Sequence, residues 1–360
     1  MKKINCLTLL SHSIIILNLF GCSRGYSSQS QELRLSEPKS LINLPAGPFI
    51  QHTMSWSKDG TQILLQKETW TAEDIQNKKH KYWLFGSEGS ALENTTNIDF
   101  NNFEMETKDK NQPSVKLKED QIVWDTCNNK KITISGTNIF ETDSTTWEMN
   151  VWKGIVPIGS FTFSSKQWMN DNIPHISPGS SYSFSPNCDF FTVTLSGWTS
   201  YEIFADEELW LLDISKMSFS REIIGRSGFI KLWDDPVQSV YPNWSPVENR
   251  FVFGGGRFGV EIYDLETKER KWLIQPKASA RWNLPQWSPS GKWIALIGGH
   301  DSRSVLIISP DGKNYATTGA CYLTDIQWSP KKDNLAYLCE SDIPESHNVR
   351  LSLWIWNVAD

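Results

Sequence analysis

The sequence predicts an all-β repeat protein, and two observations support this fold class. Aromatic residues are frequent along the chain of 360 residues, with 18 Trp, 17 Phe and 9 Tyr, and turn-forming residues lie between them, with 22 Gly and 17 Pro. Aromatic residues favour strands, whereas Gly and Pro mark the turns that join them. The second observation is one short motif that recurs along the chain, which is the sign of a repeat architecture.

The repeated motif is an aromatic residue followed by Ser and, in most copies, Pro. Its copies begin at Trp56, Phe184, Trp244, Trp287 and Trp328, with a degraded copy at Trp124. The last three copies are 43 and 41 residues apart, and the earlier ones are 60 to 68 apart. These spacings fit a unit of about 40 residues that carries loop insertions in its earlier copies.

Strand-like segments follow each copy of the motif in the same order. In the fifth unit an apolar run, Trp293–Ile297, is followed by a second run, Val305–Ile308. In the better copies a further run follows, such as Lys271–Ile274. Four short antiparallel strands per unit, repeated about six times, predict a β-propeller. A seventh unit within the stretch 66–124 is the alternative.

The motif resembles the TolB-type, WD-like propeller repeat, whose consensus is close to Trp-Ser-Pro-Asp-Gly followed by an apolar strand. The resemblance covers residues 40–360 and implies a propeller with protein or envelope-component partners. The last unit ends at Asp360, after its third strand, so we expect Ser40–Pro45 to supply the missing outer strand. That strand would close the ring and remove an exposed sheet edge.

The first 21 residues are typical of a signal peptide. Lys2 and Lys3 precede an apolar stretch that ends at Phe20 and is too short to span a bilayer. The following Leu19-Phe20-Gly21-Cys22 resembles a bacterial lipoprotein box, which implies a lipid on Cys22. An ordinary signal peptide with a chance Cys is the alternative. Residues 22–39 are polar and Ser-rich, as expected for a flexible tether, and 40–360 form the propeller.

The lipoprotein box also implies a location. We expect an extracytoplasmic protein held to the membrane by its N-terminal lipid. Ser23, rather than Asp, follows Cys22, which favours the outer membrane in a Gram-negative cell. In another envelope the protein would lie on the outer face of the cell membrane.

Composition argues against nucleic acid as a partner. The chain carries 35 basic and 41 acidic residues, for a net charge of -6, whereas phosphate binding requires a basic surface. Hydrophobic residues make up 39%, which is enough for a large core and excludes disorder by composition.

The sequence predicts no catalytic residue, metal site or cofactor. The stretch Gly254–Gly259 matches a dinucleotide-binding pattern, but that pattern needs a following helix, and Val260–Asp264 has the pattern of a strand. The six His residues are scattered without metal-ligand spacing. We therefore interpret the glycines as a loop between strands and the His residues as surface or loop positions.

Trp and Cys residues have predicted structural roles. Trp56, Trp244, Trp287 and Trp328 occupy the repeat position, so we expect them to pack between blades and pair their indole N–H groups. Four cysteines beyond Cys22 allow three disulfide connectivities. We favour the pairing of Cys321, which precedes the innermost strand of the last unit, with Cys339, which ends the strand that folds back on it. Cys127 and Cys188, which lie in equivalent turns of consecutive units, would form the second bond; four free thiols are the alternative.

The loops opposite the motif turns form the candidate binding face, because binding residues concentrate on loops of rigid scaffolds. The residues placed there are Trp198, Tyr201, Asp206, Asp234, Asp235, Arg257, Arg281, Trp282, His300, Asp301 and Arg303. The leading hypothesis is a non-catalytic binding or scaffold module for a protein, peptide, glycan or envelope component. The alternative is a propeller enzyme acting on carbohydrates, lactones or esters at the axial mouth, with Asp206, Asp234, Asp235, Asp301 and His300 as its candidates.

Overall fold

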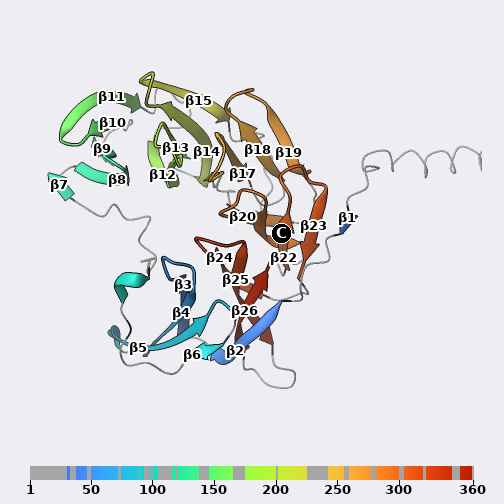
Figure 1. The fold of residues 1–360 in the computed structure, drawn as a ribbon. Helices are drawn as coiled ribbons and strands as arrows, with labels where there is room; N and C mark the ends of the chain where they lie inside the picture. Colours follow the sequence, from blue (N-terminus) through green and yellow to red (C-terminus); the bar gives the residue numbers. More distant parts are fainter. Residues whose placement is uncertain are drawn as a thin grey trace, which may run out of the picture.

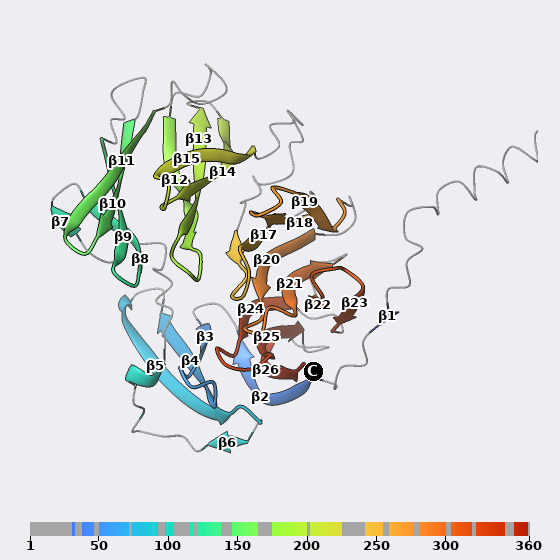
Figure 2. The same ribbon diagram turned by 45° about the horizontal axis from the view of Figure 1, so that its top comes forward.

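The structure is a computed structural model of the chain. It describes residues 31–32, 38–46, 50–71, 74–88, 90–92, 98, 100–103, 116–118, 121–137, 146–164, 175–199, 202–224, 242–254, 259–276, 281–299, 304–318, 322–342 and 349–358. These residues are almost entirely strands, and they form a β-propeller arrangement of mostly four-stranded antiparallel sheets, which follow one another around the molecule in chain order (Figures 1 and 2).

The described strands group into six sheets. The first contains β3 (Ile50–Trp56), β4 (Gln62–Thr71), β5 (Asp74–Gly86) and β6 (Ala91–Leu92). The second contains β7 (Lys116–Lys118), β8 (Gln121–Cys127), β9 (Lys130–Thr137), β10 (Thr146–Lys153) and β11 (Val156–Ser164). The third contains β12 (His175–Phe184), β13 (Phe190–Thr199), β14 (Glu202–Asp213) and β15 (Ser218–Ile224).

The later sheets have the same order. The fourth contains β16 (Asn243–Trp244), β17 (Arg250–Gly254), β18 (Val260–Asp264) and β19 (Arg270–Ile274). The fifth contains β20 (Arg281–Trp287), β21 (Ile294–Gly299), β22 (Ser304–Ile308) and β23 (Asn314–Thr317), with β1 (Gln31–Glu32) on its edge. The sixth contains β24 (Tyr322–Trp328), β25 (Asn334–Asp342), β26 (Val349–Asn357) and β2 (Lys39–Ala46). A short 3-10 helix, Phe100–Asn102, follows the first sheet.

The repeated Ser builds the turn between the first and second strands of a sheet. The Oγ of Ser57 accepts the N–H of Gln62 at 2.9 Å and donates to Asp59 at 2.6 Å. Ser185 repeats both bonds, with Phe190 at 3.0 Å and Asn187 at 2.6 Å. The motif serines are almost fully buried, so these bonds satisfy polar groups that water cannot reach. This explains why Ser follows the aromatic residue.

The motif aromatics pack between sheets as expected. Trp56, Trp244 and Trp287 are each less than 8% exposed. Each of five buried apolar clusters joins two consecutive sheets: second to third, third to fourth, fourth to fifth, fifth to sixth, and sixth to first. The hydrophobic core of the described residues therefore lies between the sheets.

A reciprocal pair of hydrogen bonds ties the innermost strands of three sheets together. Trp328 Nε1 donates to the backbone oxygen of Gln286 at 3.1 Å, and Gln286 Nε2 donates to the backbone oxygen of Ile326 at 3.3 Å. The same exchange joins the sixth sheet to the first: Trp56 Nε1 donates to Gln327 O at 3.1 Å, and Gln327 Nε2 donates to Met54 O at 2.9 Å.

Trp287 departs from the expected indole pairing. Its Nε1 is buried and has no hydrogen-bond partner among the described residues. The preceding sheet carries Asn243 where the later ones carry Gln, and the Asn side chain accepts the backbone N–H of Trp287 at 2.8 Å instead. The guanidinium of Arg250 lies over the Trp287 ring, 5.0 Å from its centroid. The expectation of a paired indole N–H was therefore wrong at this copy, where the preceding sheet binds the backbone N–H of Trp287 and not its indole.

The degraded copy of the motif forms a different turn. β8 and β9 are joined by the two residues Asn128 and Asn129, with Asn128 in the left-handed region at φ 54. Asn tolerates that conformation and is favoured in two-residue hairpins. The Ser-Pro turn is therefore replaced by a tighter hairpin in the second sheet.

Two N-terminal strands pair with the outer edges of the last two sheets. β2 pairs antiparallel with β26, as expected for residues 40–45. Gln31 and Glu32, within the segment expected as a tether, pair parallel with β23. The described strands between residues 66 and 124 belong to the first two sheets. No helix in the described ranges is long and apolar enough to cross a membrane, and residues 1–21 lie outside those ranges.

Candidate functional site

Each sheet has two ends with different chemistry. The turn end carries the motif turns and their equivalents, which begin at residues 57, 128, 185, 245, 288 and 329; the loop end is the opposite one. Neighbouring sheets are linked at the turn end. Cys127 and Cys188 form a disulfide with a Cα–Cα distance of 5.7 Å, and Asn187 Nδ2 donates to Asn249 Oδ1 at 3.3 Å. Ser290 N donates to Asp333 at 3.2 Å.

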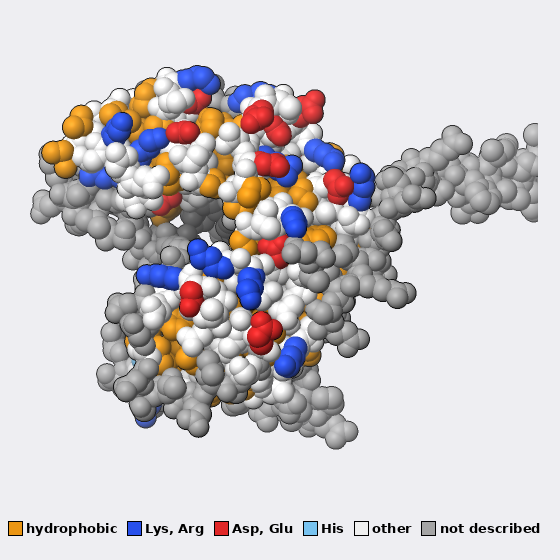
Figure 3. Space-filling view, viewed as in Figure 1, with side chains coloured by type: hydrophobic (Ala, Val, Ile, Leu, Met, Phe, Trp, Pro, Cys, Tyr) orange, Lys and Arg blue, Asp and Glu red, His pale blue; other side chains and the backbone are white. Residues whose placement is uncertain are grey.

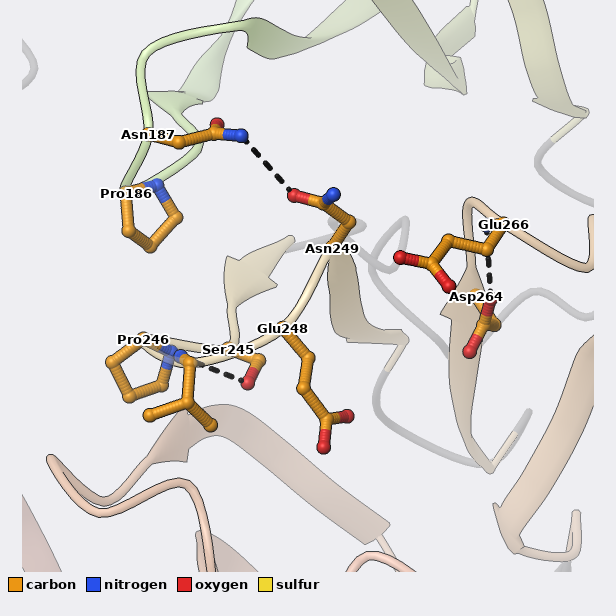
Figure 4. Close-up of a pocket in the computed structure, with 9 residues that line it drawn as sticks. Pro186, Asn187, Ser245, Pro246, Glu248, Asn249, Asp264 and Glu266 are labelled. Atoms are coloured by element: carbon orange, nitrogen blue, oxygen red, sulfur yellow. Dashed lines mark hydrogen bonds between the residues drawn. The ribbon is translucent and has the colours of Figure 1, made fainter.

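A hollow of about 340 Å³ lies in the turn end between the third and fourth sheets (Figure 4). It is lined by Pro186, Asn187, Ser245, Pro246, Val247, Glu248, Asn249, Asp264 and Glu266. Its polar groups serve the turns themselves. Asp264 Oδ1 accepts the N–H groups of Glu266 and Thr267 at 2.9 and 3.0 Å, and Glu248 pairs with Arg250 at 2.5 Å. None of the binding residues expected from the sequence lines this hollow.

Four of the expected binding residues lie at the loop end. Trp198 pairs with Ala205, and Asp206 pairs with Gly197, next to the β13–β14 hairpin. Arg281 and Trp282 begin β20 opposite Gly299 and Gly298. Trp282 is half-buried and packs against the cluster that joins the fourth and fifth sheets.

The rest of that set lies outside what the structure describes. The side chains of Trp198, Asp206 and Arg281 are outside the described residues. So are Tyr201, Asp234, Asp235, Arg257, His300, Asp301 and Arg303 as a whole. The expected site therefore remains a prediction at these positions.

Ionisable residues lie at the loop end where the sixth sheet packs against the first. Strand alternation places them on the same faces as the buried cluster of that interface. On β3, His52 follows the row of Trp56 and Met54. Lys67 and Glu340 extend the equivalent rows on β4 and β25, beyond Leu65 and Leu338. His52 and Lys67 are direct partners in the β3–β4 register.

Burial shifts the pKa of two of these groups in opposite directions. It lowers the pKa of His52 to about 4, and the positive charge of Lys67 lowers it further in the same direction. The Nε2 atom of His52 is buried without a hydrogen-bond partner among the described residues. Burial raises the pKa of the Glu340 carboxyl. Near neutral pH, His52 is therefore an uncharged imidazole, and Glu340 holds a proton more readily than an exposed Glu.

Sequence reasoning missed this pair. His52 was interpreted as one of six surface or loop His residues, and Glu340 was not singled out. One signal was present: His52, Met54 and Trp56 alternate along one strand, so all three face the same neighbour. A His on the core face of a strand is a candidate for a perturbed pKa.

The opposite face of the first sheet carries a second polar group of residues. Glu68 accepts a hydrogen bond from Gln66 at 2.8 Å and an ion-pair contact from Lys78 at 3.0 Å. His80 Nδ1 lies 3.6 Å from Glu68, and the His80 ring stacks with Tyr82 at a centroid distance of 6.3 Å. Donors, an acceptor and an aromatic ring in one place can bind a polar ligand with a flat face.

The described part of the chain contains a further disulfide-bonded cysteine but no metal-binding or dinucleotide-binding group. Cys339 is disulfide-bonded, whereas Cys321, its expected partner, lies outside the described residues. No group of three His, Cys, Asp or Glu within the described ranges could hold a metal ion. Gly259, at φ 84, is followed directly by β18, a strand and not the helix that dinucleotide binding needs.

No protein family model and no curated protein matches the chain. Solved structures that are similar include an oligogalacturonate lyase in complex with manganese, at 10% identity and a TM-score of 0.37, and an oligogalacturonate lyase from Vibrio parahaemolyticus, at 12% and 0.45. Each covers 92% of this chain and 99% of the other. An acylaminoacyl peptidase matches at 11% identity and 0.46, covering 86% of this chain and 51% of its own.

The activities named in these matches are enzymatic. At 10 to 12% identity and TM-scores below 0.5, however, the matches assign neither a substrate nor a site residue to this chain.

Proposed function

We propose that the protein is a six-bladed β-propeller, closed by β2 and anchored outside the cytoplasm by a lipid on Cys22, that binds a ligand at its loop end. Six described sheets, each joined to a neighbour by a buried cluster, support the blade number. The β2–β26 pairing, together with the cluster joining the sixth sheet to the first, supports closure. The lipoprotein box supports the anchor.

One contrast carries the proposed site. At the turn end, the polar side chains with hydrogen bonds act within the turns or link neighbouring turns. At the loop end of the sixth and first sheets, His52 and Glu340 have pKa values shifted by burial. Shifted ionisable groups on a rigid scaffold are typical of functional sites.

The ligand class follows from the residues that share the loop end. Trp198 and Trp282 lie on strands at the loop end, and the described ionisable groups there, His52, Lys67 and Glu340, supply hydrogen-bond donors and acceptors. Such combinations suit a glycan or an extended peptide, in which flat apolar faces alternate with polar groups. We propose a ligand of this class, with no nucleic acid partner.

A second candidate function is catalysis on a carbohydrate, lactone or ester bound at the same end. Glu340 carries the specific observation, because a carboxyl whose pKa is raised by burial is the form of acid that glycoside and ester chemistry uses. His52, held neutral, would position a substrate oxygen through a hydrogen bond. Asp206, Asp234, Asp235, Asp301 and His300 are the further candidates from the sequence.

The test compares ligand binding at the two ends. The full chain is screened against immobilised oligosaccharides and peptides, together with Trp198→Ala, Glu340→Gln and the turn-end control Glu266→Gln. We expect Trp198→Ala to weaken binding by about tenfold or more and Glu266→Gln to leave it unchanged. Equal losses in Trp198→Ala and Glu266→Gln would contradict a loop-end site.

Product analysis on the bound ligand separates the two functions. If the ligand is cleaved, Glu340→Gln should lower kcat by about a hundredfold while the variant still binds. Uncleaved ligand would support the binding module.

Mass spectrometry of the membrane fraction tests the anchor. We expect a mature chain that begins at Cys22 and carries added acyl mass, and we expect no such species in Cys22→Ala.

A further inference from the structure

The hairpin of β10 and β11 ends in an exposed apolar tip. Lys153 pairs with Val156, so Gly154 and Ile155 form a two-residue turn. Gly154 is at φ 61, and a Gly in the first of two turn positions suits this kind of hairpin. Ile155 is 90% exposed, Val156 57% and Ile158 38%.

The tip is held rigidly by its own sheet. Gly154 N donates to Asn129 O at 2.6 Å, which fixes this turn against the neighbouring β8–β9 turn. A register shift at Val151 and Trp152 leaves Ile158 in a bulge of the edge strand β11. The apolar side chains are therefore displayed on paired backbone, and their exposure is not an effect of a loose loop.

The charged residues of the tip and of the adjacent β8–β9 turn are all lysines. Lys153 is exposed beside the turn, and Lys131 Nζ lies 4.9 Å from the centroid of the Trp152 ring. Lys130 pairs with Asp189 of the next sheet at 3.1 Å. The segments 128–131 and 152–158 contain no acidic residue. Figure 3 shows the hydrophobic side chains at the edge of the molecule where Figure 1 draws β10 and β11, with basic side chains beside them.

The chain also enters the domain from the turn end, on which this tip lies. β1 runs parallel to β23, and β23 begins directly after the turn that starts at Ser309. Gln31 is therefore at the turn end of the fifth sheet. Cys22 is nine residues earlier in the sequence, a span of at most about 30 Å when fully extended.

We propose that the tip of the β10–β11 hairpin inserts into an anionic lipid surface. Ile155, Val156 and Ile158 would enter the boundary between headgroups and acyl chains, and Lys131 and Lys153 would contact lipid phosphates. Apolar side chains ringed by Lys are the pattern of interfacial membrane binding. The inference deepens the proposed membrane attachment and rests on it for the orientation of the domain.

A photo-cross-linking experiment tests this contact on the full chain. A photoactivatable phenylalanine analogue replaces Ile155 or, as the control, Leu284, which is 41% exposed on β20. Each protein is reconstituted with vesicles of phosphatidylcholine, with or without one-third phosphatidylglycerol, and irradiated. Adducts are identified by mass. We expect at least fivefold more lipid adduct from position 155 than from position 284, and at least threefold more on the anionic vesicles.

Two further variants keep the result interpretable. Lys153→Glu should lower the lipid adduct at position 155 on anionic vesicles at least threefold while leaving thermal unfolding unchanged. In the Cys22→Ala background, a lipid adduct that persists at position 155 would support the tip even if lipidation fails. Two outcomes would overturn the inference: equal lipid adduct at positions 155 and 284, or, in native membranes, adducts of position 155 with protein instead of lipid.

Discussion

The two ends of the same sheets differ in how their polar side chains are used. At the turn end, Ser57, Ser185 and Ser288 bond to their own turns, and a disulfide and an Asn pair join neighbouring turns. At the loop end of the first and sixth sheets, His52 has a buried ring nitrogen without a partner among the described residues, and the pKa of Glu340 is raised. One end is built by local bonds, whereas the other carries groups whose ionisation is unfavourable.

Because of this difference, we expect residues at one end of a strand to determine stability and residues at its other end to determine ligand binding. Substitutions at the turn end should lower the free energy of unfolding and leave ligand binding intact. Substitutions at the loop end should change binding or pH dependence at a smaller cost in stability.

Removing the Cys127–Cys188 disulfide should have the largest effect. The bond joins residues 61 apart in the sequence, and a cross-link of that span stabilises a chain by about 4 kcal/mol through the entropy of the unfolded state. We expect the double variant Cys127→Ser, Cys188→Ala to lose about that amount in urea unfolding and to bind ligand normally when folded. A loss below about 1 kcal/mol would show that the turn end does not depend on this link.

Removing a turn Ser should have an intermediate effect. Ser288 is fully buried, and its Oγ accepts the N–H of Trp293 at 3.2 Å. In Ser288→Ala that buried N–H loses the Oγ acceptor, which costs about 1–3 kcal/mol. The matched control is Ser160→Ala, an exposed Ser that hydrogen-bonds Glu148 at 2.8 Å, with an expected loss below about 0.5 kcal/mol. Equal losses in the two variants would contradict the structural role of the motif Ser.

The turn end could be predicted from the sequence because the hydrogen bonds of each turn join residues that are close together in the chain. The aromatic-Ser-Pro motif contains both partners of each turn bond within six residues, and the strand runs beside it identify the sheets. The edge pairing of residues 40–45 was also accessible, because the last unit lacked a strand. The second sheet was harder, since Asn128 and Asn129 replaced the motif by a different hairpin.

The loop-end pair could not be found in the same way. His52 and Glu340 are almost 290 residues apart, and the shift in each pKa depends on how deeply the packed sheets bury it. The unpaired indole of Trp287 was also out of reach of the sequence, because its surroundings are supplied by the neighbouring sheet, whose Asn243 accepts the backbone N–H of Trp287. Contacts between units are not encoded in any one repeat.

The pH dependence of stability should show the smallest of the three effects, at the loop end. The pKa of His52 is about 4 in the folded protein and 6.5 as an ordinary value. Between these values the unfolded chain binds a proton that the folded chain does not, so stability falls as the pH falls from 6.5 to 4. His52 is partly exposed, which screens the effect, so we expect a loss of about 1 kcal/mol between pH 7 and pH 4.5.

Two variants assign that slope to His52. His52→Gln removes the titrating group and should abolish the loss of unfolding free energy on acidification, whereas His80→Gln, on the exposed face of the same sheet, should retain that loss. Burial raises the pKa of Glu340, so this carboxyl contributes in the opposite sense and does so in both variants. Asp213 and Asp311 have pKa values below the ordinary 3.8, so their contributions are lost below the range measured. A slope that persists unchanged in His52→Gln would mean that the sixth and first sheets do not desolvate this ring.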